Sequence, residues 1–173
     1  MATEEDPRQG YGACAVSART NPRDSAGPDS SLRYNVVVST PDADPIAALL
    51  KRSKIIAVVG LSDIPLRPSH GVAAYMQAQG YRIIPVNPQI AEALGEKAYS
   101  TLRDVPGRID IVNIFRRPEF VEEIVDEAIA LKVPAIWMQE GVIHEKAAAK
   151  ARAAGAFVVM DRCILKEHKV RFG

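Results

Sequence analysis

The sequence predicts an α/β fold, a doubly wound and mostly parallel β-sheet with helices on both faces. Runs such as KIIAVV at 54–59 and IDIVNIF at 109–115 are apolar almost throughout, which is typical of strands buried on both faces. Segments with helical periodicity lie between these runs, and parallel strands joined by helices need right-handed crossovers. With 173 residues, the chain is long enough for one such domain with a full core.

Order is expected to begin at Asp44, because an aspartate followed by Pro45 is typical of a helix start, here before IAALLKR. The run at 54–59 gives the first strand. We expect Ser69 to cap the next helix, HGVAAYMQAQ, which stops at a glycine. YRIIPV at 81–86 then gives the second strand.

A short helical or irregular piece is expected over 89–106, followed by the third strand at 109–115. The clearest helix is PEFVEEIVDEAIALK, whose apolar stripe starts at Phe120 and whose first turn is acidic. VPAIWMQ at 133–139 gives the fourth strand. The helix HEKAAAKARAA and a last strand, AFVVM at 156–160, complete the alternation.

The two ends of the chain differ from the domain expected over 44–166. Residues 1–33 are rich in Gly, Pro, Ser, Arg and Asp, and they cannot bury enough surface to offset the entropy of ordering. We expect a disordered leader over 1–40, except that VVV at 36–38 could form an edge strand or part of a docking segment. Residues 167–173 are expected to be a solvated polar tail.

Composition excludes several classes of function. A net charge of +1 lacks the basic excess that nucleic-acid binding usually leaves. Cys14 and Cys163 lie far apart, so the sequence indicates neither a disulfide framework nor a cysteine zinc site, and a reducing cytoplasm fits best. No apolar stretch is long enough to span a membrane. We therefore expect a soluble cytoplasmic protein that binds neither nucleic acid nor membrane.

The loop after the first strand, GLSDIPLRPSHG, is the first candidate site, because ligands of open parallel sheets bind beyond the carboxyl ends of the strands. At Gly60 a side chain would obstruct the approach of a phosphate, and the loop ends at a helix N-terminus, which favours an anion. Arg67 and Ser69 would add a guanidinium and a hydroxyl to a pyrophosphate site. The loop lacks GxGxxG, however, and a solvated Arg67 is the alternative.

The second loop separates ligand classes. NAD-binding domains usually end this strand with an acid that bonds the ribose 2′-hydroxyl, whereas this chain has Val86, Asn87 and Pro88. An acid there would repel a phosphate on the ribose, so its absence favours NADP or coenzyme A. A simple Asn-Pro turn is the other interpretation.

Arg116 and Arg117 follow the third strand directly, beside the aromatic surface of Phe115. The end of the strand directs this loop at the expected crevice, so we expect at least one of the two arginines to contact an anionic ligand. The other one would then be solvent-exposed.

Four segments together resemble a known family: VVGLSDIPLRPSHGVAAYMQAQGYRIIPVNP, DIVNIFRRPEF, AIWMQEGV and VVMDRCI. They resemble the stand-alone proteins of the CoA-binding domain family and, more distantly, the N-terminal domain of the succinyl-CoA synthetase alpha subunit. The match spans roughly residues 45–166. The resemblance implies a Rossmann-like fold and a bound coenzyme A or acyl-CoA.

The resemblance also implies which residues contact the cofactor, in four groups. The pyrophosphate would lie on Gly60, Leu61, Ser62, Arg67 and Ser69, and the adenosine would lie against Val86, Asn87 and Pro88. The loop over the cofactor would be formed by Phe115, Arg116 and Arg117, and the pantetheine arm would lie near Gln139, Glu140 and Gly141.

Groups for catalysis are not evident. His70, His144 and His168 are scattered and no motif surrounds them. Cys163 is read as a small buried hydrophobe, with a mixed disulfide to the CoA thiol as the alternative. We expect a non-catalytic CoA-binding module that acts as a sensor, carrier or partner subunit. An NADP-dependent oxidoreductase and a subunit of an acyl-CoA ligase or transferase remain as alternatives, and a protein partner or a homo-oligomer is compatible with the sequence.

Overall fold

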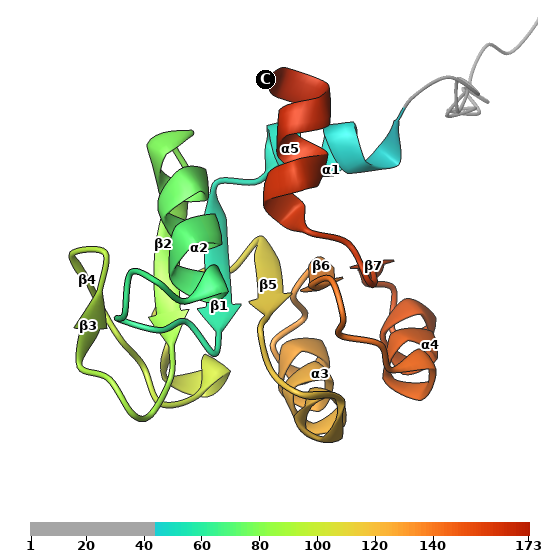
Figure 1. Ribbon diagram of the computed structural model, residues 1–173. Coiled ribbons are helices and arrows are strands. Elements are labelled where there is room, and N and C mark those ends of the chain that lie inside the picture. The colour runs from blue at the N-terminus through green and yellow to red at the C-terminus, as the bar shows by residue number, and fades with distance from the viewer. Residues whose placement is uncertain (1–43) are drawn as a thin grey trace, which may run out of the picture. The chain divides into compact units, whose positions relative to one another are not determined.

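The computed structural model of the protein describes residues 44–173 (Figure 1). The expectations for residues 1–40, including the VVV segment at 36–38, lie outside the described residues.

One parallel sheet forms the centre of the described domain. It has the strand order β2-β1-β5-β6-β7, and every neighbouring pair is parallel. This arrangement confirms the predicted doubly wound, Rossmann-like α/β fold. The strands are β1 (Ile55–Val59), β2 (Arg82–Val86), β5 (Ile111–Ile114), β6 (Ala135–Met138) and β7 (Phe157–Val159).

A single parallel bridge extends the sheet beyond β2. Tyr99 pairs with Val86: its amide donates to the Pro85 carbonyl at 3.0 Å, and its carbonyl accepts from the Asn87 amide at 2.8 Å. Tyr99 therefore occupies the place of the third strand in the Rossmann order 3-2-1-4-5-6. The direction of strand order reverses between β1 and β5, and this is where the ligand crevice of such a sheet lies.

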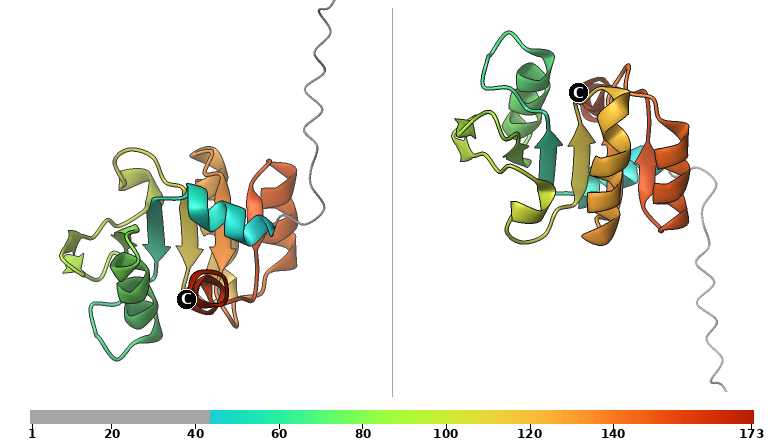
Figure 2. Two further views of the ribbon diagram at one scale, coloured as in Figure 1. Left: turned by 90° about the horizontal axis from the view of Figure 1, so that it is seen from above. Right: turned by 90° about the horizontal axis from the view of Figure 1, so that it is seen from below.

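Helices cover both faces of the sheet (Figure 2). The alternation of side chains along β1 shows why, since Ile56 and Val58 pack in one apolar cluster while Ala57 and Val59 pack in the other. The first cluster is covered by α1 (Pro45–Arg52), α2 (Pro68–Ala78) and α5 (Ile164–Phe172), and the second by α3 (Val121–Ala130) and α4 (Glu145–Ala153). None of the helices described between residues 44 and 173 is long and apolar enough to cross a membrane.

The piece expected to be helical or irregular over 89–106 contains a small hairpin and a turn of 3₁₀ helix. The hairpin pairs β3 (Glu92–Ala93) with β4 (Glu96–Lys97), and η1 (Leu102–Asp104) follows Tyr99. A second 3₁₀ turn, η2 (Pro118–Phe120), precedes α3. The two 3₁₀ turns, η1 and η2, bring residues to the carboxyl edge of the sheet.

Two expectations about helix starts are wrong. Pro68 takes the first position of α2, as prolines often do, so the cap is Arg67 and Ser69 lies inside the helix. The Ser69 hydroxyl instead accepts a hydrogen bond from the Ser62 amide at 3.1 Å. Phe120 belongs to η2 rather than to the buried stripe of α3, and 40% of its surface is exposed.

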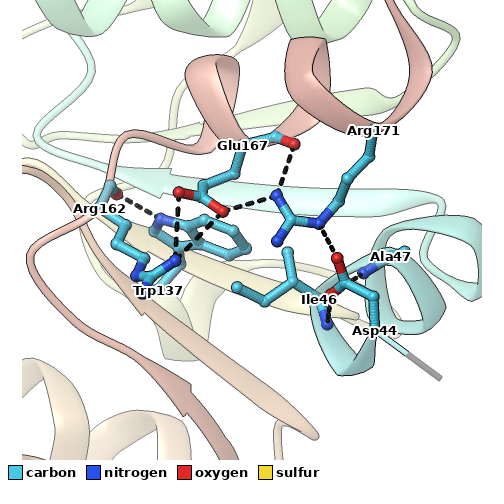
Figure 3. Close-up of polar contacts among 7 residues, drawn as sticks. All are labelled: Asp44, Ile46, Ala47, Trp137, Arg162, Glu167 and Arg171. Carbon is cyan, nitrogen blue, oxygen red and sulfur yellow. Dashed lines mark hydrogen bonds and ion pairs between the residues drawn. The ribbon is translucent and has the colours of Figure 1, made fainter. Parts of the chain in front are cut away.

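The polar tail predicted over 167–173 is also wrong, because these residues belong to α5. Ile164, His168 and Phe172 recur at four-residue spacing on one face of this helix, and His168 is buried. Arg171 donates to the carboxylates of Asp44 and Glu167, at 2.6 Å each, which ties the end of α5 to the start of α1 (Figure 3). The charged residues of this segment therefore surround a short stripe in which Ile164 and His168 are buried and Phe172 is 38% exposed.

Trp137 packs in the core of the sheet. Its side chain is fully buried in β6, and Nε1 donates to the Arg162 carbonyl at 2.6 Å (Figure 3).

Candidate functional site

The candidate site lies at the carboxyl ends of β1 and β5, where strand order reverses. The Gly60 amide donates to the Val86 carbonyl at 2.9 Å, and the Phe115 amide donates to the Val59 carbonyl at 2.8 Å, so the three strand ends are held together. Two surface hollows meet here, and Gly60 and Arg116 line both of them. We refer to the two adjoining hollows together as the crevice.

Gly60 is required by the packing of the crevice itself. Its φ is +87°, and a Cβ at this position would lie 2.6 Å from the Phe115 carbonyl oxygen and 2.9 Å from Cδ of Arg116. Both the backbone conformation and the close approach favour glycine. From the sequence, we expected a side chain at Gly60 to obstruct a bound phosphate. In the structure, such a side chain would collide with the chain itself, between the loops after β1 and β5.

The larger hollow, of about 510 Å³, lies at the N-terminus of α2. Its charge favours an anion, because the exposed Arg67 and the half-buried Arg116 line it next to the positive end of the helix dipole. The expected site residues that it brings together are Gly60, Ser62, Arg67, Ser69, Asn87, Phe115 and Arg116. Asp63, Ile64, Gln89 and Ile90 also line it and were missed.

Hydrogen bonds shape the wall of the larger hollow. The Asn87 side-chain amide donates to the Leu61 carbonyl at 2.9 Å, and its oxygen accepts from the Gln89 amide at 3.0 Å. The Ser62 hydroxyl accepts from the Ile64 amide at 3.1 Å. Asn87 therefore holds the loop after β1 in place, and Leu61, whose side chain is fully buried, has only backbone atoms to offer a ligand.

The smaller hollow, of about 240 Å³, has an apolar floor and a polar rim. Val59, Val86 and Pro88 contribute from the ends of β1 and β2, and Phe120 contributes an aromatic ring. Such a floor suits a flat apolar group such as a nucleobase. The rim residues, all of which were missed, are Ser100, Thr101, Glu123 and Glu127.

Two of the missed residues of the smaller hollow come after a short strand pairing that the sequence did not indicate. Ser100 and Thr101 come directly after the bridge at Tyr99, so they lie at a strand end like the other site residues. The signal was weak because one bridged residue leaves no apolar run. Glu127 accepts from the Leu102 amide at 3.3 Å and pairs with Arg103 at 3.7 Å, which fixes one side of the rim.

The two arginines after β5 differ in their surroundings. Arg116 joins the hollows, and its guanidinium carbon lies 4.9 Å from the centre of the Phe120 ring, a cation–π contact that orients it. Arg117 is exposed, lines neither hollow and pairs with Glu119 at 3.3 Å. Arg116 is therefore the member of the pair that is placed for ligand contact.

The loop after β6 lies outside both hollows. Gln139 is buried and donates to Asn113 Oδ1 at 2.8 Å, and the Gly141 amide donates to Asp161 at 2.8 Å. Glu140 is exposed, and its hydrogen bond raises the pKa of Lys166. The structure does not bring these residues together with the crevice, and the pantetheine contact implied for Gln139, Glu140 and Gly141 stays a prediction.

The histidines lie apart from one another. His70 is half-buried near the start of α2, and Nδ1 of His144 accepts from the Ala147 amide at 3.1 Å as the cap of α4. His168 lies on α5, and Cys163 is partly buried at the start of that helix. Within residues 44–173 no group of three or more His, Cys, Asp or Glu side chains is arranged to hold a metal ion.

Known proteins resemble this chain in sequence and in fold. The uncharacterized protein YneT of Bacillus subtilis (strain 168) is 47% identical over 133 residues, which are 77% of this chain and 98% of YneT. A hypothetical protein from Pyrococcus horikoshii OT3 superposes with a TM-score of 0.72 at 37% identity, over 74% of this chain and 90% of that one.

A longer relative matches part of the chain. The acetate–CoA ligase [ADP-forming] II subunit alpha of Pyrococcus furiosus is 33% identical over 73 residues, which are 42% of this chain and 16% of the subunit. The family model described as CoA binding domain matches residues 54–169 of this chain, which contain both hollows. The chain therefore belongs to the CoA binding domain family.

Proposed function

We propose that the protein binds coenzyme A or an acyl-CoA in the crevice at the ends of β1 and β5, as a binding module without chemistry of its own. The observation that carries this proposal is the crevice itself. An anion-favouring hollow and a hollow with apolar walls and a polar rim meet at Gly60 and Arg116, at the switch point of the sheet. Coenzyme A has the same two parts, a run of phosphates and an adenine.

The larger hollow suits the phosphates. The N-terminus of α2 supplies the positive end of a helix dipole, and Arg67 lies at the cap position of this helix. Arg116 is at the junction, where a guanidinium reaches a ligand in either hollow. Charged hydrogen bonds of this kind are among the strongest that a protein can offer a phosphate.

The smaller hollow suits the adenine. Val86 and Pro88 offer one apolar surface and Phe120 offers another, next to the positively charged Arg116. The carboxylates of Glu123 and Glu127 on the far rim would repel a phosphate, so the ribose phosphate is expected on the Arg116 side. The end of β2 carries Asn87 rather than an acid, which also supports a ribose that bears a phosphate.

A role in binding rather than catalysis fits the side chains around the crevice. Neither hollow is lined by a histidine or a cysteine, and the carboxylates of Glu123 and Glu127 belong to the rim of the smaller one. The module would act as a sensor, a carrier or a partner subunit. The last role is supported by the printed name of the Pyrococcus furiosus relative, a ligase subunit that shares part of this domain.

Calorimetric titration of ligand-free protein with CoA, dephospho-CoA, NAD and NADP tests the proposal. We expect CoA to bind most tightly, dephospho-CoA more weakly because it lacks the ribose phosphate, and the two nicotinamide cofactors not at all. Binding of NADP without CoA would show that the crevice has been assigned to the wrong ligand and would favour a reductase. Retention of a larger chain on the immobilised protein, dependent on CoA, is the test of the partner-subunit role.

A further inference from the structure

A third hollow lies at the opposite end of the sheet from the crevice. Lys54 and Tyr81, which line it, immediately precede β1 and β2, so it lies at the amino ends of these strands. Its other walls come from the ends of α1 and α2 and from α5, which contributes His168 and Phe172. This amino-end hollow has a volume of about 290 Å³ and shares no lining residue with the crevice.

His168 presents an unpaired polar atom to the amino-end hollow. The residue is only 6% exposed, and its Nδ1 lies 3.1 Å from the Tyr75 hydroxyl. Among residues 44–173, Nε2 has no protein partner, although every fully buried side-chain nitrogen and oxygen there has one. Nε2 therefore keeps some exposed surface, and because His168 lines the hollow, we infer that Nε2 faces it. The rings of Tyr75 and Tyr81 lie edge-on at 5.6 and 5.8 Å and hold the imidazole in place.

The charge of the amino-end hollow favours an anion. Lys51 and Lys54 are exposed at its rim, and no aspartate or glutamate lines it. The ammonium of Lys51 lies 5.8 Å from the centre of the Phe172 ring, so a cation already occupies the aromatic face and would repel another. The carboxyl ends of α1 and α2 also lie at this hollow, and the negative end of each helix dipole is equivalent to about half a charge, which the two ammonium groups together outweigh. The Leu50 carbonyl at the end of α1 already accepts a hydrogen bond from the Tyr81 hydroxyl at 3.0 Å.

The size and walls of the hollow narrow the class of ligand. At roughly 30 Å³ for each group the size of a water molecule, a hollow of about 290 Å³ holds about ten non-hydrogen atoms. Tyr81 and Phe172 offer apolar surface, and His168 offers one buried nitrogen, which suits a singly charged head better than a phosphate that needs several donors.

We propose that the amino-end hollow is a second binding site, for a small organic carboxylate. The carboxylate accepts a hydrogen bond from Nε2–H of His168, in the tautomer whose Nδ1 accepts from the Tyr75 hydroxyl, and it attracts the ammonium groups of Lys51 and Lys54. The apolar body packs against Tyr81 and Phe172. The proposal stands on residues that the CoA crevice does not use, so it holds or fails independently of the proposed function.

Titration of the full-length protein with benzoate, followed by NMR of the histidine ring signals, tests the second site. We expect a saturable shift of the His168 signal that CoA does not reverse. The double variant Lys51→Ala with Lys54→Ala should bind benzoate about tenfold more weakly or worse, since it removes both ammonium partners. The matched control removes two lysines from α4, Lys146→Ala with Lys150→Ala, and should leave the titration unchanged.

Four results would overturn the proposal. The first is no saturable shift of the His168 signal, and the second is equal weakening by both double variants, which would indicate general attraction by surface charge. The third is displacement of benzoate by CoA, which would place it in the crevice. The fourth is tighter binding of inorganic phosphate or tetramethylammonium than of benzoate, which would assign the hollow to another class of ligand.

Discussion

Replacing Gly60 by alanine separates the two reasons for a glycine in the crevice. Gly80, at the end of α2, has a φ of +92° and nothing within 4 Å of an added Cβ, while Gly60 has a φ of +87° and a backbone oxygen at 2.6 Å. Alanine at Gly80 carries only the strain of the left-handed region, about 1 kcal/mol after the gain from a stiffer unfolded chain. Alanine at Gly60 adds an overpacking cost of about 1–3 kcal/mol, because the Phe115 backbone must move.

Urea unfolding of Gly60→Ala and Gly80→Ala, side by side with the wild type, measures the difference. At a slope of about 2 kcal/mol per molar urea, the Gly60 variant should unfold about 0.5–1.5 M below the Gly80 variant. Calorimetry with CoA adds a second readout. Only the Gly60 variant should bind CoA more weakly, because only its added methyl group pushes the loops after β1 and β5 apart.

Equal unfolding midpoints for the two variants would refute this reasoning. The 2.6 Å contact would then relax without cost, and the conformational preference at Gly60 alone would explain the residue. An unchanged CoA affinity in a destabilised Gly60 variant would instead separate the close approach from the ligand site.

The remaining predictions concern a ligand contact, a buried histidine and an ion pair. Arg67→Ala should weaken CoA binding by about 1.5–3 kcal/mol, roughly 10- to 150-fold, while Arg152→Ala on the exposed side of α4 should not change it in the same calorimetric titration. Burial lowers the pKa of His168, so below the ordinary histidine pKa of about 6.5 the unfolded chain takes up a proton that the folded chain resists. The contribution of His168 to the free energy of unfolding should thus be complete at pH 7.5 and be lost as the pH drops below about 6.5 and through the folded-state pKa. The urea midpoint of His168→Gln should depend less on pH over this range. Arg171→Met should lower the free energy of unfolding by about 1–3 kcal/mol, because it removes the 2.6 Å partner of both Asp44 and Glu167 and leaves Glu167 only the longer contact with Arg162 at 3.4 Å; an unchanged urea midpoint would contradict this.

The fold could be predicted because its determinants are local. Every residue from 56 to 59 of β1 is buried, so the strand is a continuous apolar run in the sequence. The helix α3 buries Val121, Val125 and Ala128, which recur at helical spacing and give a clear stripe. In both cases the pattern within ten residues determines the element.

The parts that were missed depend on distant contacts. Tyr99 is a strand residue only because β2 pairs with it, and the rim at Ser100 follows from that pairing. The helix α5 has little apolar pattern, and its buried stripe includes His168, which is tolerated because Tyr75 provides a hydrogen-bond partner 93 positions away in the sequence. Neither partner can be identified from its local segment.

Asn87 shows how the ligand class and the loop conformation are coupled. From the sequence, the absence of an acid at this position favours a ligand with a phosphate on its ribose. In the structure the Asn87 amide nitrogen donates to the Leu61 carbonyl at 2.9 Å, so an aspartate would set a carboxylate oxygen against a carbonyl oxygen. The loop after β1 therefore disfavours the acid even without a ligand. An acid that bonds the adenosine ribose of NAD would need a different path for this loop. The absence of the acid and the shape of the larger hollow therefore have the same cause, the hydrogen bond from Asn87 to the loop after β1.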